Sequence, residues 1–262
     1  MAINMKSYEK YFNEYAIKMR SKISGWPDMP AVLDEVNLKI EHSYIVRDRC
    51  VEIAKWLKLP GRDIELAAIA GLYHDLGRFR QALEFGTMSD SITGSHGDMS
   101  ADIFLNEALK DGLNTEEIEM IADSIRWHNR FKLPVNLPER TTLFAKLVRD
   151  GDKLDIFHFY TDKAEKRIFR FIMSAEDGDY SPDMLEGALK GENLSVSGIR
   201  NKNDRKLMLI SLVYDLNFGY SFQYVLEKDY LGLITGVADG TADKVMEQVY
   251  DYAVKWMKER VD

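Results

Sequence analysis

The sequence predicts an all-α protein, and three observations support this fold class. Apolar residues recur at intervals of three and four along most of the chain, which is the period of an amphipathic helix. Glycine and proline separate these stretches, and no segment shows the alternation that indicates paired strands. The chain has 262 residues, of which 45% are hydrophobic and 30% charged, so it can bury a sizeable core.

The first part of the chain predicts five helices. The first carries apolar residues from Tyr8 to Met19 and ends before the glycine and prolines of residues 25–30. A second is expected at about 33–57, and a third at 62–76, whose nearly continuous apolar run predicts burial on most sides. Residues 80–97 are rich in Gly, Ser, Thr and Asp and predict a loop. The remaining two helices are expected at 99–109 and, after a capping-box pattern of Asn114 and Glu117, at 115–128.

The second part predicts a long helix over about 140–173 and a loop region with a short helix at 182–189. Another helix is expected at 204–225, and a last one carries Val245, Val249, Tyr252 and Trp256 at helical spacing. We therefore expect an N-terminal helical extension (residues 1–30), a core (31–175) and a C-terminal helical subdomain (176–262) packed on that core.

Charge and composition limit the partners and the compartment. The net charge is −8 and the basic residues are scattered, which argues against a long nucleic acid but allows a small anionic substrate. No stretch resembles a signal peptide or a membrane span, so no membrane contact and a cytoplasmic location are expected. The single cysteine, Cys50, excludes an intramolecular disulfide, and its apolar neighbours predict a buried thiol. A homo-oligomer stays open.

The chemistry is expected where the third helix ends, at His74-Asp75. Adjacent residues on a helix point about 100° apart, so both side chains reach one ion only if it lies beside the helix between them. Gly71, one turn earlier, leaves room for another backbone to approach. Taken alone, the dipeptide is better explained as a capping or salt-bridge pair, because short motifs are often accidental.

The wider pattern changes this interpretation. His42 lies on the preceding helix and Asp152 on a later one, within the sequence LVRDGDKLDIF. The order H…HD…D resembles the HD superfamily, and LYHDLGRF is similar to that family's second block. Gly151 stands where the family usually has Ala, and Asp150 and Asp155 are minor rivals for the ligand position of Asp152.

Two further histidines, His96 and His128, fall between the second and last blocks. The full order resembles the six-ligand subset of the superfamily, which holds two metal ions bridged by the HD aspartate. The resemblance covers about residues 35–160 and implies an HD-domain helical bundle with additional C-terminal helices. The simpler alternatives are a solvated loop histidine for His96 and a helix C-cap for His128.

The resemblance implies a metal-dependent phosphohydrolase acting on a small phosphorylated substrate, such as a nucleotide or a phosphorylated metabolite. Imidazole and carboxylate suit one or two divalent ions of Mn, Fe, Ni, Co or Zn, and such ions activate water for attack on a phosphate mono- or diester. Asp75 is expected to bridge or to accept a proton, and Arg78, Arg149 and Lys153 are the candidate cations for the phosphate.

Two alternatives from other functional classes stay open. Some HD-type proteins with this ligand order use a mixed-valent di-iron centre as an oxygenase, and others are non-catalytic modules that sense nucleotides. A fold does not decide between them. Iron and dioxygen dependence would identify the first, and the loss of a ligand would be typical of the second.

Overall fold

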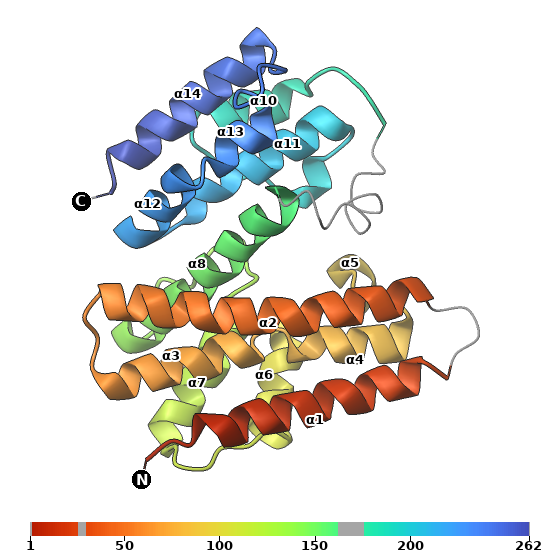
Figure 1. The fold of residues 1–262 in the computed structure, drawn as a ribbon, viewed down its shortest axis with the longest axis vertical. Helices are drawn as coiled ribbons and strands as arrows, with labels where there is room; N and C mark the ends of the chain where they lie inside the picture. The colour runs from red at the N-terminus through yellow and green to blue at the C-terminus, as the bar shows by residue number, and fades with distance from the viewer. Residues whose placement is uncertain (1, 26–29, 162–175, 262) are drawn as a thin grey trace. The chain divides into compact units, whose positions relative to one another are not determined.

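The computed structural model describes residues 2–25, 30–161 and 176–261, and this part of the chain contains helices and no strand (Figure 1). The all-α prediction is confirmed. The chain divides into two compact units, Met1–Asp152 and Lys153–Asp262. The division falls within a helix, whereas the predicted boundary at residues 175–176 lies at the edge of the part that is not described.

Among its described residues, the first unit contains seven helices and most of an eighth: α1 (Met5–Ile23), α2 (Pro30–Trp56), α3 (Gly61–Tyr73), α4 (Leu76–Phe85), α5 (Asp90–Thr93), α6 (His96–Asn106), α7 (Thr115–Trp127) and α8 (Glu139–Thr161). Helices α1, α2 and the pair α3–α4 lie side by side in Figure 1. The prediction that residues 80–97 form a loop is wrong in part. Helix α4 continues to Phe85 because it buries Phe79 and Ala82 on one face, and it ends at Gly86 in the left-handed conformation.

Helix α1 belongs to the core of the first unit. The rings of Tyr8 and Phe12 are fully buried, and the Phe12 ring lies 5.9 Å from that of Phe79 and 6.4 Å from that of Tyr73. The hydroxyl of Tyr73 donates to the backbone carbonyl of Tyr8 at 3.0 Å, so its buried oxygen has a partner. These contacts fix α1 against the two helices that lead into and out of His74-Asp75.

Small residues allow helices α2, α3 and α8 to approach closely. A Cβ on Gly71 would lie 2.9 Å from the Cα of Arg47 and from Sγ of Cys50, and one on Gly151 would lie 3.0 Å from the same Sγ. The Cys50 thiol is fully buried and burial raises its pKa, which confirms the predicted small buried hydrophobe. The absence of a side chain at Gly151 therefore leaves space for the Cys50 sulfur.

The second unit contains the end of α8, the α-helices α10 (Pro182–Leu189), α11 (Lys202–Ser211), α12 (Gly219–Glu227), α13 (Tyr230–Thr235) and α14 (Lys244–Lys258), and two short 3-10 turns. The short helix at 182–189 is confirmed. The prediction of a single helix at 204–225 is wrong. This segment forms α11, a 3-10 turn at Leu212–Asp215 and α12, and the helix is interrupted where Phe218 adopts an extended backbone conformation ahead of Gly219. The expected end of α8 near residue 173 lies outside the described residues.

Candidate metal centre

Asp75 lies at the elbow between two helices. Helix α3 ends at Tyr73 and α4 begins at Leu76, and Asp75 has φ −108° and ψ 16°, outside the helical range. The elbow is tight, because a Cβ on Gly77 would lie 2.4 Å from the carbonyl oxygen of His96 at the start of α6. The turn thus brings the carboxylate of Asp75 next to side chains from α2, α6, α7 and α8.

A first cluster of side chains faces one oxygen of Asp75. His42 Nε2 lies 3.2 Å from His74 Nε2 and 3.1 Å from Asp152 Oδ1. The Oδ2 atom of Asp75 lies 3.5 Å from His42 Nε2 and 3.4 Å from His74 Nε2. Two helices and the elbow therefore bring four predicted ligands to one point, although His42 and Asp152 are 110 positions apart in the sequence.

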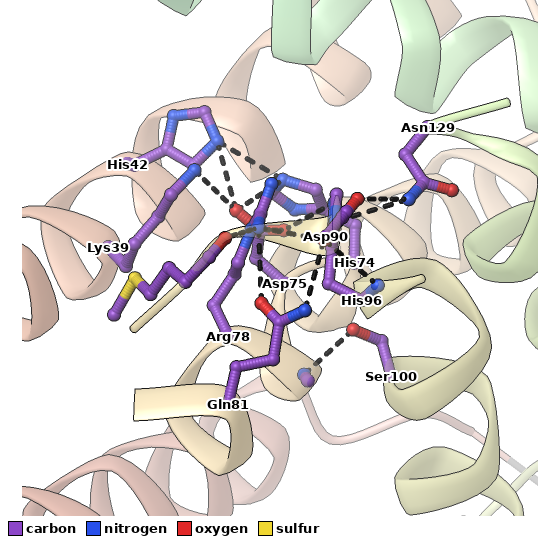
Figure 2. A network of polar contacts seen from close by, with 12 residues as sticks. Lys39, His42, His74, Asp75, Arg78, Gln81, Asp90, His96, Ser100 and Asn129 are labelled. Carbon is purple, nitrogen blue, oxygen red and sulfur yellow. Dashed lines mark hydrogen bonds and ion pairs between the residues drawn. The ribbon is translucent and has the colours of Figure 1, made fainter. Parts of the chain in front are cut away.

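A second cluster faces the other oxygen of the same carboxylate. His96 Nε2 lies 3.0 Å from His128 Nε2 and 3.3 Å from Asp75 Oδ1, and His128 Nε2 lies 3.9 Å from that oxygen. Figure 2 shows His42, His74 and His96 converging on Asp75. The structure thus brings all six predicted ligands together as two groups that share one aspartate. The solvated loop position considered for His96 is wrong, since its side chain is buried. His128 is the C-cap residue of α7, as the simpler alternative has it, and its buried Nε2 also faces the second cluster.

Ring orientation shows that these histidines suit metal ions. His74 Nδ1 is 2.8 Å from the Gly71 carbonyl and His128 Nδ1 is 2.6 Å from the Ile125 carbonyl, so each ring carries its proton there and turns the Nε2 lone pair inward. Two nitrogen ligands of one ion, each about 2.1 Å from it, lie about 3.0–3.4 Å apart. The observed spacings of 3.0 and 3.2 Å match.

Asp75 gives a further reason to expect a cation. Its Oδ1 atom is buried and has no hydrogen-bond partner among the described residues, a costly arrangement for a carboxylate oxygen. A bound ion would satisfy it, and mixed imidazole and carboxylate ligands suit Mn, Fe, Ni, Co or Zn. The residues present therefore fit divalent metal ions, which the two clusters would hold with Asp75 common to both.

The protonation states agree with ligand chemistry. Burial raises the pKa of Asp75, but Lys39 and His74 more than offset this and hold that pKa well below its usual range. Burial likewise opposes ionisation of Asp152, and His42 outweighs it, which lowers the pKa of Asp152. Burial, reinforced by its histidine neighbours, lowers the pKa of His128 well below 6.5. Carboxylates are thus charged and His128 is neutral at neutral pH, the forms that bind metal.

The predicted cations lie in different places. Arg78 Nε lies 3.8 Å from Asp75 Oδ1 and has no hydrogen-bond partner in the described part of the chain. Arg149 is buried, and its Nη1 donates to the backbone carbonyls of Trp127, His128 and Arg130 at the end of α7. Its role here is to stabilise that helix end, because those carbonyls have no partner within the helix. Lys153 Nζ forms an ion pair of 2.7 Å with Asp215 in the second unit.

Sequence reasoning missed two residues of this centre. Lys39 Nζ lies 2.6 Å from Asp75 Oδ2, and its position three residues before His42 on α2 was a usable signal, since such residues share a helix face. Asp90, the first residue of the short helix α5 in the loop that joins α4 to α6, lies 2.7 Å from His96 Nδ1 (Figure 2). Nothing in the local sequence indicates that contact, which depends on the path of the loop.

Comparisons with known proteins show what this centre is similar to. Residues 40–156 match the HD domain, a range that holds five complete helices and all six clustered side chains. The chain is also similar to ribonuclease Y of Protochlamydia amoebophila (strain UWE25), at 25% identity over 171 residues. That match covers 63% of this chain but 30% of the relative, so the chain spans less than a third of the relative's length. No solved structure matches the chain.

Proposed function

We propose that the chain, whose residues 40–156 match the HD domain of the metal-dependent phosphohydrolase superfamily, hydrolyses a small phosphate mono- or diester at a two-metal centre. The observation that carries the proposal is the position of Asp75, whose two oxygens face two separate groups of ligands. His42, His74 and Asp152 would hold one ion together with Oδ2, and His96 and His128 would hold the other with Oδ1.

Two divalent ions at these positions would lower the pKa of a water molecule toward neutrality and withdraw charge from the phosphoryl oxygens. The chain's own side chains would supply the remaining needs of the reaction. Neutral Nε2 atoms and ionised carboxylates bind cations without first losing protons. Burial of the ligands keeps bulk water from competing, which strengthens every charge interaction in the centre.

Two cations are placed to hold a phosphate beside the metals. Lys39 approaches Asp75 from α2, and Arg78 presents an unpartnered Nε–H to the opposite oxygen of that carboxylate. The Nε–Oδ1 distance of 3.8 Å is too long for a hydrogen bond, so this N–H keeps its donor capacity beside the centre. Arginine and lysine thus flank the centre from two helices.

The substrate class follows from charge and from the similarity to ribonuclease Y. Cleavage of RNA is the hydrolysis of a phosphodiester, so the relative's name is compatible with this chemistry. A net charge of −8 without a basic stretch disfavours long nucleic acids, whose binding depends on many phosphate contacts. We therefore favour a nucleotide or a phosphorylated metabolite, and short RNA is the comparison to test.

The experiment is a substrate panel with purified protein loaded with Mn or Co. Nucleotides, phosphorylated metabolites and a short single-stranded RNA are incubated in air and without oxygen, and phosphate or nucleotide release is measured. We expect turnover of a small ester that is indifferent to dioxygen and abolished in Asp75→Ala. Strict dependence on iron and dioxygen, with no phosphate released from any ester, would establish the oxygenase alternative instead. Absence of turnover with the metals bound would favour a sensing module.

None of the helices in the described part of the chain combines the length and the apolar character that spanning a bilayer requires. A cytoplasmic location and the absence of membrane and long nucleic-acid partners are part of the proposal. The proposal also leaves the second unit without an assigned part in catalysis.

A further inference from the structure

The loop between α4 and α6 is organised around a single carboxylate, that of Asp90. Its Oδ1 accepts from Arg78 Nη1 at 3.0 Å and from Gln81 Nε2 at 3.0 Å, both on α4. Its Oδ2 accepts from Asn129 Nδ2 at 3.1 Å, one residue after His128. Figure 2 shows these donors gathered around Asp90 from elements on different sides of the loop. One side chain therefore ties the loop to the proposed phosphate cation and to the end of α7.

Asp90 also fixes the ring of His96. The two carboxylate oxygens lie 2.7 and 2.9 Å from His96 Nδ1, and Oδ1 additionally accepts from the His96 backbone N–H at 3.3 Å. A carboxylate accepts only, so it holds the imidazole proton on Nδ1. The lone pair then lies on Nε2, the atom that faces His128 and Asp75 Oδ1.

His96 differs from His74 and His128 in what anchors its ring. His74 and His128 donate to backbone carbonyls in the last turns of α3 and α7, and these acceptors persist as long as the helices do. His96 instead relies on the side chain of Asp90, which is 37% exposed. The position of His96 in the second group, formed by His96, His128 and Asp75 Oδ1, thus depends on a removable side chain.

We propose that Asp90 is the positioning residue for the second metal ion: it sets the tautomer of His96 and couples that ligand to Arg78. The inference rests on the proposed two-metal centre, but not on the identity of the reaction. Partners of this kind orient metal ligands, and their removal typically weakens metal affinity about 10–100-fold.

The test is a metal titration of the full chain with Mn²⁺ as the probe. Binding constants come from calorimetry, ions per chain from elemental analysis, and the coupling between ions from electron paramagnetic resonance. We expect wild type to bind two coupled ions. In Asp90→Ala and Asp90→Leu the weaker constant should fall at least about tenfold, while the tighter one changes less than about threefold. The spectrum should become that of one isolated ion.

The leucine variant keeps roughly the size of the side chain but has no acceptor for His96 Nδ1–H, so it remains informative if the alanine variant fails to fold. Asp102→Asn is the matched control, because Asp102 lies on α6 with a side chain that is 61% exposed. Equal losses at both sites, unchanged constants in the Asp90 variants, or a single ion in wild type would each overturn the proposal. A protein that binds two ions but releases no phosphate would refute the proposed function and leave this inference intact.

Discussion

Substituting Gly77 by alanine tests whether the tight elbow positions the metal ligands. The added Cβ would lie 2.4 Å from the carbonyl oxygen of His96, 2.8 Å from Met99 Cβ and 2.9 Å from the backbone nitrogen of Ser100. Ordinary contact for a Cβ begins near 3.4 Å, so α4 and α6 must separate by about 1 Å. Two of the three atoms belong to the backbone and cannot turn aside.

The magnitude follows from two opposing effects. Overpacking of this kind costs about 3 kcal/mol at the upper end of its usual range. The higher helix propensity of alanine than of glycine offsets about 1 kcal/mol of this cost, so the free energy of unfolding should fall by about 2 kcal/mol. Gly61→Ala is the matched control, because a Cβ there meets nothing within 4 Å. That variant should be unchanged or more stable by about 0.5 kcal/mol.

The assay is urea unfolding of both variants in metal-free buffer, followed by Mn²⁺ titration. Gly77→Ala should unfold at lower urea and lose affinity for its second ion, since His96 moves relative to Asp75 when α6 is displaced. If Gly77→Ala unfolds at the same urea concentration as Gly61→Ala and binds both ions equally well, the elbow does not position the centre and the reasoning is refuted.

Three further outcomes are expected. Lys39→Ala should raise KM for the phosphorylated substrate at least about tenfold with both ions retained, and an unchanged KM would exclude it as a phosphate contact. Arg149→Ala should lower the free energy of unfolding by about 1–3 kcal/mol, because the carbonyls at the end of α7 lose this donor, and it should leave KM unchanged. A raised KM with unchanged stability would support the phosphate-binding role predicted from sequence. Metal-free protein should lose thermal stability as pH falls below about 6.5. Burial lowers the pKa values of His96 and His128 in the folded protein. Below this pH the two side chains are therefore protonated in the unfolded chain but not in the folded protein, which favours unfolding. A melting temperature that is flat between pH 7.5 and 5 would contradict this, and His128→Ala should flatten part of the slope.

Local signals allowed most helices to be predicted. The capping box of Asn114 and Glu117 forms as expected at the start of α7. The break between α11 and α12 was not predictable from periodicity, because the apolar pattern continues through it. The hydroxyl of Ser211 helps to explain it: it donates to the Met208 carbonyl and accepts from the backbone N–H of Leu194, a residue distant in sequence. The hydrogen bond between Ser211 and Leu194 thus forms at the point where α11 ends.

The candidate centre shows the same division between local and non-local information. The spacing of His74 and Asp75 and the order of the other histidines indicated which residues converge, since ligand types carry their chemistry in the sequence. The direction of Arg149 could not be predicted, because a cation near a ligand can equally face the end of a neighbouring helix. Asp90 was missed since its contact with His96 depends on the path of a loop.

The lone cysteine offers a built-in reporter of how often the centre opens. Cys50 is the only thiol in the chain, and it lies enclosed between Gly71 and Gly151, one turn from Asp75 and next to Asp152 respectively. A thiol-reactive probe can reach it only when α2, α3 and α8 separate, an event that also disperses the ligands. Its labelling rate should therefore fall in proportion to the fraction of protein without metal, about 100-fold when free metal is 100 times its dissociation constant. A routine chemical label would thus read out metal binding without any knowledge of the substrate.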